Sequence, residues 1–474
     1  MPAPSPLSEI SPIDGRYRKE VSGLFQYCSE FALFRYRLLV EVSYLEAFAS
    51  ELGDRVEVTD GDIRFLRKVL KGFDEQAAQE VKAYEEKVNH DVVAVVEYLK
   101  YLCRRGGHGK LGRYIHFGLT SDDVNNISYS LMLKDAVLKG YLPALTDLCR
   151  TLSEMAVELK LEPMLGHTHG QPASPTTLGK ELANYLVRLS RLARSLSAFE
   201  YPGKLTGAVG NFSALHVNFP DVDWVRFSES FVSSLGLRPV LLTTQVLPHD
   251  DISSLLDGIS IADRVVQNLD VDMWLYCSLG YLRLKRADGE VGSSTMPHKV
   301  NPIDFENSEG NAKLGASLLE SLSSELEMSR MQRDLSDTTL KRNYGVALAH
   351  SMLSAKKTAK GLRRVDADGE AMKADLDAHA EVLGEALQLL LRKAGREGAF
   401  EDVMGMLKGK TMSLKEFREA VRSSPLKGDA GPLLALKPEE YLGLAPRLVD
   451  LAVRQAAADI AEAENASRKH VPSF

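Results

Sequence analysis

Cysteine is scarce in this sequence: the chain of 474 residues has four, and no two of them form a C-x-x-C pair. This scarcity excludes a disulfide framework or a zinc knuckle as the basis of the fold. No run of about eighteen apolar residues occurs, and the first residues lack the basic and apolar regions of a secretory signal. We therefore expect a protein of the reducing cytoplasm, with no membrane partner.

Excess positive charge is also missing. Lys and Arg number 58 against 65 Asp and Glu, so the formal net charge is −7. This balance argues against nucleic acid or an anionic membrane surface as the main partner. An anionic small molecule would need a locally basic pocket. The length of the chain predicts two or three domains.

Strand-like alternation is almost absent, whereas apolar residues recur at three- and four-residue intervals over long stretches. This periodicity predicts an all-α fold with an elongated, antiparallel central bundle of about five long helices, at roughly 121–159, 176–200, 251–286, 305–330 and 339–361. Pro143 is expected to bend the first of them. Two smaller helical domains flank the bundle in this prediction, giving bounds of 1–118, 119–365 and 366–474.

A loop rich in chemically active side chains, Gly289–Asn311, separates two of the long helical patterns. Its glycines and prolines end both helices, and Ser293, Ser294, Lys299 and Asn301 lie close enough to converge on one anion. A serine hydroxyl is a poor base unless its anion is stabilised, and Lys299 with the backbone N–H groups of the Gly-Ser-Ser turn offers that stabilisation. An ordinary surface loop with solvated side chains is the alternative.

A second polar loop spans Pro163–Thr177 and contains His167 and His169. Two histidines two residues apart sometimes bind a metal, but no Cys, Asp or Glu lies nearby to complete a zinc site. Proton transfer is the better interpretation, because a histidine side chain can hold or release a proton at working pH. No metal site is predicted.

Three further segments combine charge with hydrogen-bonding groups. Asn89-His90-Asp91 interrupts an apolar helical pattern, although a lone histidine in such a place is more often structural. Thr120 and Ser121 start a helix with two aspartates behind them, and a helix start of this kind also attracts anions. The segment 329–343 contains Arg, Lys, Ser and Thr, which suit either a solvated turn or a phosphate cradle. The segment 107–112 matches G-x-G-x-x-G, but no strand precedes it, so we expect a simple connection.

Two of these motifs point to one known family. The segment Gly292–Pro302 resembles the G-S-S-x-M-P-x-K-x-N-P segment of the fumarase/aspartase superfamily, and Thr168–Pro172 is similar to its T-H-x-Q-P segment. The Pro-His-Lys form of the first motif resembles that of the adenylosuccinate lyase family rather than fumarase or argininosuccinate lyase. His167 departs from the pattern, since many members have arginine there.

The resemblance implies a carbon–nitrogen lyase of purine nucleotide synthesis that eliminates fumarate from adenylosuccinate, giving AMP, and from succinylaminoimidazole carboxamide ribotide. It implies a homotetramer whose active sites combine segments of three subunits, and no cofactor. Ser293 is the expected base and His169 the expected acid. The expected substrate-binding residues are Arg16, Tyr17, Asn89, His90, Asp91, Thr120, Ser121, Gln245, Ser294, Lys299, Asn301, Asn307, Arg333, Thr338, Thr339, Leu340, Lys341 and Arg342.

Within that set, Lys299 and Asn301 are expected at the succinyl carboxylates, while Arg16, Tyr17, His90, Arg333 and Arg342 are expected at the phosphate and ribose. Ser294 remains the alternative to Ser293 as the base, because the sequence does not distinguish between two neighbouring serines. The rival activities are those of argininosuccinate lyase and fumarase. A non-catalytic helical scaffold is the rival of a different class.

Overall fold

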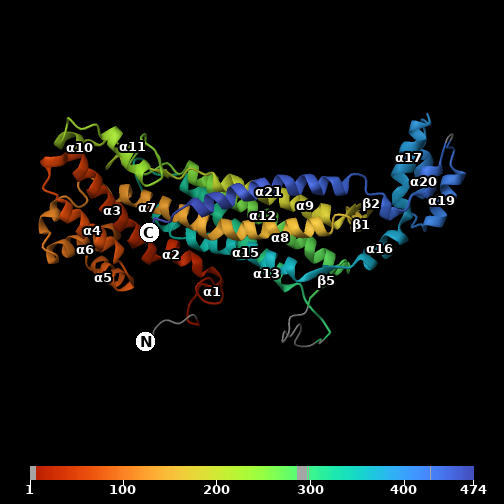
Figure 1. Ribbon diagram of the computed structural model, residues 1–474, viewed down its shortest axis with the longest axis horizontal. Helices are drawn as coiled ribbons and strands as arrows, with labels where there is room; N and C mark the ends of the chain where they lie inside the picture. Colours follow the sequence, from red (N-terminus) through yellow and green to blue (C-terminus); the bar gives the residue numbers. More distant parts are fainter. Residues whose placement is uncertain (1–6, 286–295, 297, 427–428, 474) are drawn as a thin grey trace.

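The computed structural model describes residues 7–285, 296, 298–426 and 429–473. A long bundle of helices forms the body of the molecule, with a group of N-terminal helices at one end and a small C-terminal group at the other (Figure 1). The prediction of an all-α, elongated bundle is confirmed. Among the described residues, no helix is both long and apolar enough to cross a membrane.

The bundle consists of helices whose apolar side chains share one core. Helix α12 packs against α13 and α9, and α13 packs against α15. These helices are α7 (Ser121–Ala136), α8 (Leu142–Glu158), α9 (Leu178–Ser197), α12 (Asp250–Ser278), α13 (Ile303–Leu326), α15 (Tyr344–Arg363) and α21 (Ala445–Lys469). Helix α12 ends at Ser278 rather than at 286, because Gly280 has a φ of +79° and turns the chain away.

The first long helix is interrupted where a bend is expected. A π-helical turn, Val137–Tyr141, joins α7 to α8 just before Pro143. Proline has no N–H to donate to the carbonyl four residues earlier, so the regular bonding pattern cannot pass through it. The same turn lets the N-terminal segment approach, since a Cβ on Gly140 would lie 2.4 Å from Leu24 Cδ2.

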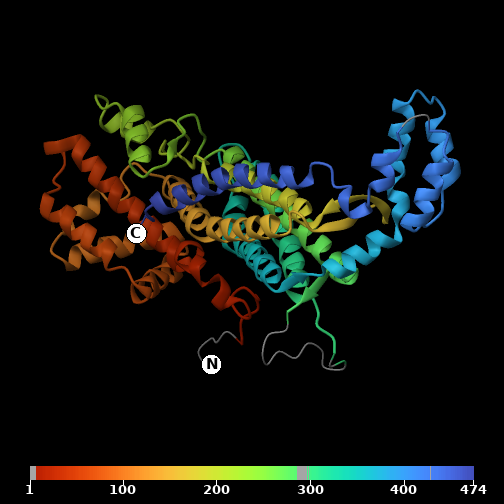
Figure 2. The same cartoon turned by 45° about the vertical axis from the view of Figure 1, so that its right-hand side comes forward.

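The N-terminal helices and two helices from the middle of the chain form one end of the molecule (Figure 2). Stacked, tilted and edge-on aromatic rings join them, including those of Tyr44, Phe48, Phe117, Trp224 and Phe227. The helices are α1 (Arg18–Val21), α2 (Phe25–Cys28), α3 (Glu30–Leu52), α4 (Asp60–Lys71), α5 (Glu75–Val88), α6 (Asp91–Arg105), α10 (Ser213–Asn218) and α11 (Trp224–Ser234). Short 3-10 turns lie at Ser22–Leu24, Gly53–Arg55 and Gly109–Arg113.

Residues 366–474, expected as one C-terminal domain, divide between two cores. A separate small core is built on α17 to α20 and includes Leu387, Leu391 and Phe417. Helix α21 instead packs along α8 and α9, and its buried side chains belong to the main core. The remaining helices are α16 (Gly369–Ala378), α17 (Gly384–Lys393), α18 (Ala399–Leu407), α19 (Leu414–Ser423) and α20 (Gly431–Ala435), with 3-10 turns at Ala380–Leu383 and Pro438–Glu440.

The tail that follows α21 is held against the bundle by a buried carboxylate. Asp135, near the end of α7, is fully buried and accepts a hydrogen bond from Tyr36 Oη at 2.5 Å. The backbone N–H of Ser473 donates to the same carboxylate at 3.0 Å, and His470 pairs with its other oxygen. The segment from His470 to Ser473 is therefore part of the packed structure.

Within the described part of the chain, three short two-stranded sheets accompany the helices. Strand β1 (Pro163–Thr168) pairs antiparallel with β2 (Gln171–Thr177), and β5 (Leu282–Leu284) pairs antiparallel with β6 (Val365–Ala367). Strand β3 (Pro202–Gly203) pairs parallel with β4 (Arg238–Pro239). The β1–β2 hairpin lies where the sequence predicts only a loop, because its glycines and prolines hide the two-residue period.

Two aspartates are buried on α12, inside the bundle. Asp263 accepts a hydrogen bond from Ser351 Oγ at 2.6 Å, and Asp270 accepts one from Thr358 Oγ1 at 2.7 Å. Burial raises the pKa of both carboxyls well above the ordinary value. The folded protein therefore favours the protonated form, which the unfolded chain loses above about pH 4.

Asp270→Asn is expected to raise the unfolding temperature more at pH 8 than at pH 5. The folded pKa lies above the unfolded one, so the wild type loses stability as pH rises through this interval, and the amide removes that loss. Thermal unfolding followed by circular dichroism measures the effect. Asp257→Asn, an exposed site on the same helix, is the control. An equal shift at both pH values for Asp270→Asn would contradict the expectation.

Candidate active site

The start of α7 is fixed by buried charges. Thr120 precedes the helix, and its N–H donates to Asp123 Oδ2 at 2.9 Å, so the predicted helix start is confirmed. Asp123 also pairs with Lys204 Nζ at 2.9 Å, and both side chains are fully buried. Asp122 lies 3.1 Å from Arg333 Nη1. Ser121, between Thr120 and Asp122, is half-buried. The backbone N–H groups at the start of α7 therefore lie close to the guanidinium group of Arg333.

The Asn89–Asp91 turn lies between α5 and α6 and supplies both of their caps. Asn89 ends α5 in a left-handed conformation, with φ of +50°. His90 Nδ1 accepts a 3.4 Å hydrogen bond from the Val93 N–H at the start of α6. Asp91 pairs with Arg37 at 2.6 Å and with Arg342 at 3.0 Å. Burial alone would raise the pKa of Asp91, but the two guanidinium groups hold it below the ordinary value.

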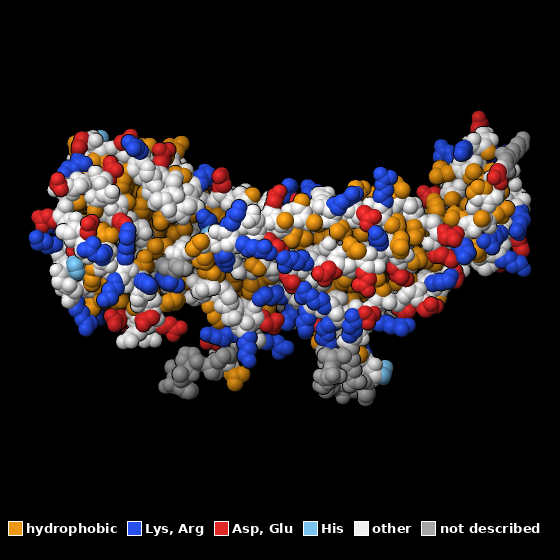
Figure 3. All heavy atoms as spheres, in the orientation of Figure 1, with side chains coloured by type: hydrophobic (Ala, Val, Ile, Leu, Met, Phe, Trp, Pro, Cys, Tyr) orange, Lys and Arg blue, Asp and Glu red, His pale blue; other side chains and the backbone are white. Residues whose placement is uncertain are grey.

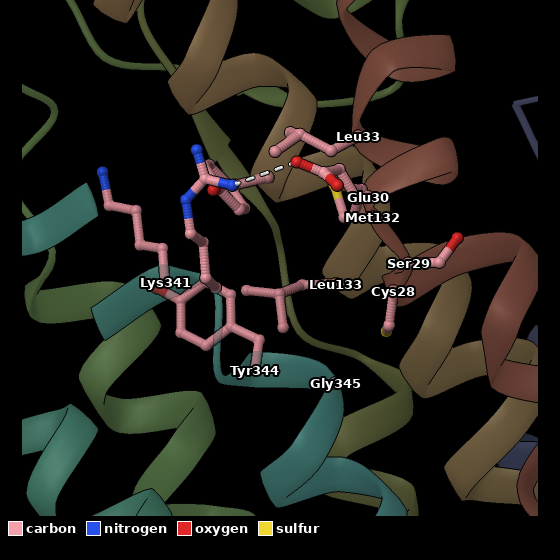
Figure 4. Close-up of a pocket in the computed structure, with 11 residues that line it drawn as sticks. Cys28, Ser29, Glu30, Leu33, Met132, Leu133, Lys341, Tyr344 and Gly345 are labelled. Atoms are coloured by element: carbon pink, nitrogen blue, oxygen red, sulfur yellow. Dashed lines mark ion pairs between the residues drawn. The ribbon is translucent and has the colours of Figure 1, made fainter. Parts of the chain in front are cut away.

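The third segment of this site is α14 (Ser336–Lys341) with Arg342 directly after it. Lys341 is buried, and its ammonium lies 2.6 Å from Asp337 Oδ2, so its contact is with the protein interior. Arg342 is 40% exposed and is also 3.9 Å from Glu30, at a cavity of about 280 Å³ (Figure 4). His249 lies close by, and burial together with Lys341 lowers its pKa to about 3.

These segments bring together most of the predicted substrate-binding residues. Gln245 joins them, because its N–H donates to the carbonyl of Gln332 at 3.2 Å, next to Arg333. We call this group the α7 cluster. It comprises Asn89, His90, Asp91, Thr120, Ser121, Gln245, Arg333, Thr338, Thr339, Leu340, Lys341 and Arg342.

His116 belongs beside the α7 cluster, although the sequence patterns did not select it. It lies four residues before Thr120 with φ of +61°, and its Nδ1 is 2.6 Å from Glu41 Oε1, a fully buried carboxylate. Burial opposes a charge on this ring, but Glu41 outweighs it and raises the pKa of His116. Gly118, two residues later, also has a left-handed conformation. This glycine was the feature of the sequence that could have indicated an unusual turn at His116.

His169 stands at the turn of the β1–β2 hairpin. It is exposed, with φ of +54°, and is followed by Gly170 with φ of +70°. A cavity of about 1220 Å³ lies beside the hairpin and is lined by His167 and Thr168, together with residues of α12 and α21. Among the described residues, no group of three metal-ligating side chains gathers here or elsewhere.

The third group of predicted residues lies around the start of α13. Ser293 and Ser294 fall outside the described residues, whereas Lys299 is exposed and Asn301 is half-buried just before the helix. Asn307 Nδ2 donates to Tyr17 Oη at 2.9 Å, and the Arg16 guanidinium lies 6.0 Å from the Tyr17 ring centre. We call Arg16, Tyr17, Lys299, Asn301 and Asn307 the α13 group.

Helix α12 separates the α7 cluster from the hairpin. His249, the residue just before its start, adjoins Lys341 and Arg333, whereas its last residue, Ser278, lines the cavity beside the hairpin. At 1.5 Å per residue, the 29 residues of α12 span about 42 Å. Figure 1 accordingly shows α7 and the β1–β2 hairpin toward opposite ends of the bundle. One copy of the chain therefore cannot bring His169 to Arg333.

Comparison with known proteins agrees with this architecture. Residues 15–314 match a family model described as lyase, and residues 329–442 match one described as adenylosuccinate lyase C-terminal. The adenylosuccinate lyase of Legionella pneumophila (strain Corby) is 40% identical over 447 residues, which is 94% of this chain and 98% of that protein. The chain belongs to the adenylosuccinate lyase family. The resemblance inferred from the Gly292–Pro302 and Thr168–Pro172 motifs is thus confirmed.

Other members of the family and more distant structures extend the comparison. The adenylosuccinate lyase of Escherichia coli (strain K12) is 39% identical over 450 residues, 94% of this chain and 99% of that protein. The 3-carboxy-cis,cis-muconate lactonizing enzyme of Pseudomonas putida covers 92% of this chain and 97% of its own, with a TM-score of 0.72 at 20% identity. A fumarate lyase from Mesorhizobium sp. BNC1 gives 0.72 at 19% identity, with the same coverage. These two structures share the fold.

Proposed function

We propose that this chain eliminates fumarate from adenylosuccinate and from succinylaminoimidazole carboxamide ribotide in purine nucleotide synthesis. Relatives that carry the name adenylosuccinate lyase match nearly the whole chain, which supports the reaction. The α7 cluster supports the substrate class. Its helix start and the guanidinium groups of Arg333 and Arg342 offer the donors that a nucleotide phosphate needs.

The elimination needs a base, an acid and fixed positive charge. In this proposal Ser293 removes the proton from the carbon next to a succinyl carboxylate, and Lys299 with Asn301 stabilises the negative charge that develops. His169 gives a proton to the departing nitrogen. The α7 cluster, with Arg16 and Tyr17, holds the phosphate and ribose. Side chains supply every group, so the reaction requires neither a metal nor an organic cofactor.

The active site in this proposal is shared among copies of the chain in a homotetramer. One copy gives the α7 cluster, a second gives His169, and a third gives the α13 group. The span of α12 supports this division, because it keeps the first two apart within one copy. Exposed apolar side chains on the bundle support close association, and they include Ile261, Trp274, Leu275, Leu314, Leu448 and Leu451. Figure 3 shows apolar patches along one face of the bundle. Four cysteines without disulfides suit the cytoplasm.

Fumarate production, followed by absorbance, tests the activity against its rivals. We expect turnover of adenylosuccinate and no fumarate from argininosuccinate or malate, because those substrates have no nucleotide phosphate for the α7 cluster. Fumarate from argininosuccinate or malate instead would assign the chain to the corresponding rival. Binding of AMP without turnover of any substrate would indicate a scaffold.

A further inference from the structure

Arg37 lies on α3, away from every motif that the sequence singles out, and it is the largest fully buried side chain of the described residues. Its guanidinium divides its hydrogen bonds between two helices. Nε donates to Asn125 Oδ1 at 2.8 Å, and Nη2 donates to Asp91 Oδ2 at 2.6 Å. Nη1 is buried and has no hydrogen-bond partner within the described part of the chain. Removing one partner of a buried ion pair is costly, because the other charge is then left buried and unpaired.

One partner of Arg37, Asp91, belongs to the α7 cluster, and the other, Asn125, lies on α7 just after it. Asn125 is one helical turn after Ser121 on α7, and Asp91 is the first residue of α6. Asp91 Oδ2, the oxygen that accepts from Arg37, also accepts from Arg342 Nη2 at 3.0 Å. A continuous chain of contacts thus runs from α7 through Arg37 and Asp91 to Arg342.

Exposure increases along this chain from the interior to the surface. The side chain of Arg37 is 0% exposed, that of Asp91 is 17% exposed, and that of Arg342 is 40% exposed. Glu30 also lies 3.9 Å from Arg342 (Figure 4), but it is itself paired with Lys82 at 2.7 Å. Asp91 is therefore the nearer anion for Arg342, and its carboxylate is held by Arg37 at Oδ2 and by the Val92 N–H at Oδ1.

We propose that Arg37 is a positioning residue of the lyase site: it holds Asp91 between α6 and α7 and thereby fixes the exposed Arg342 guanidinium toward the nucleotide phosphate. The inference rests on the proposed function, in which Arg342 contacts that phosphate. Arg37 itself does not contact substrate. Arginine is required here because its planar fork reaches acceptors on two helices at once, whereas a lysine ammonium is a single point.

Steady-state kinetics of Arg37→Lys with adenylosuccinate test the proposal. We expect KM to rise roughly tenfold or more while kcat falls less, because a displaced Arg342 weakens binding more than proton transfer. Arg67→Lys is the matched control, since Arg67 pairs with Glu46 on the exposed face of the same N-terminal helices. It should keep the wild-type KM. If Arg37→Lys does not fold, Arg37→Gln, which keeps a donor without the charge, takes its place.

A double-mutant cycle separates positioning from stability alone. Arg342→Lys should raise KM strongly in the wild type and much less in Arg37→Lys, because Arg342 is already displaced there. A lower unfolding temperature with unchanged KM, or effects on KM that simply multiply, would overturn the proposal. Absence of turnover in the wild type would instead overturn the proposed function, so the two failures are distinguishable.

Discussion

His169→Ala is expected to lower kcat for fumarate release by roughly two to four powers of ten, the range that general acid catalysis contributes. The departing nitrogen needs a proton, and no other histidine occupies the turn of the β1–β2 hairpin. Because His169 is exposed, its loss should leave the far-ultraviolet circular dichroism signal unchanged. Initial rates measured by absorbance, together with the spectrum, check both statements.

His216→Ala is the matched control, because His216 is another exposed histidine, on α10. It should keep wild-type turnover. Ser293→Ala should match the loss seen with His169→Ala, and Ser294→Ala decides between the neighbouring serines, since only the base is indispensable. Wild-type rates for both His169→Ala and Ser293→Ala would show that the roles are misassigned.

Co-expressing His169→Ala with Arg342→Met is expected to restore activity that neither variant has alone. If each site takes the hairpin from one copy and the α7 cluster from another, random assembly of equal amounts leaves roughly one site in four with both groups intact. Activity of the purified mixed oligomer should therefore approach a quarter of the wild-type value. Differently tagged chains allow the mixed species to be isolated.

A second pair of variants provides the control for this experiment. Arg333 and Arg342 both belong to the α7 cluster, so Arg333→Met mixed with Arg342→Met should restore nothing, because every site then takes one defect from its single donor copy. Recovery in this pair, or no recovery with His169→Ala, would contradict the shared site. Because α12 spans about 42 Å, His169 and the α7 cluster of one copy cannot serve the same site. The activities recovered by the two pairs of variants should therefore differ clearly.

Much of the fold follows from the sequence because long helices carry their own signal. The apolar stripes that predict α7 to α9, α12, α13 and α15 are the surfaces that pack together in the bundle. The β1–β2 hairpin carries no such signal, since neighbouring helices rather than strand propensity hold its short strands. The packing of α21 against the main core is also not predicted from the sequence, because an apolar stripe does not identify the helix that it packs against.

The candidate site was likewise predictable only in part. Motifs with adjacent polar residues, such as Asn89–Asp91 and Thr120–Ser121, are visible in the sequence and prove to share one cluster. Residues whose partners are distant along the chain cannot be recognised from the sequence. Arg37 meets Asn125 across 88 positions, and His116 meets Glu41 across 75. Only the fold brings such pairs together, so neither residue stands out beforehand.

The anchored tail has a practical consequence for handling the protein. Ser473 donates its N–H to a carboxylate inside the molecule, and His470 contacts the same group. An affinity tag joined after this segment would begin close to the attachment, so we expect it to disturb the packing of the tail against α7.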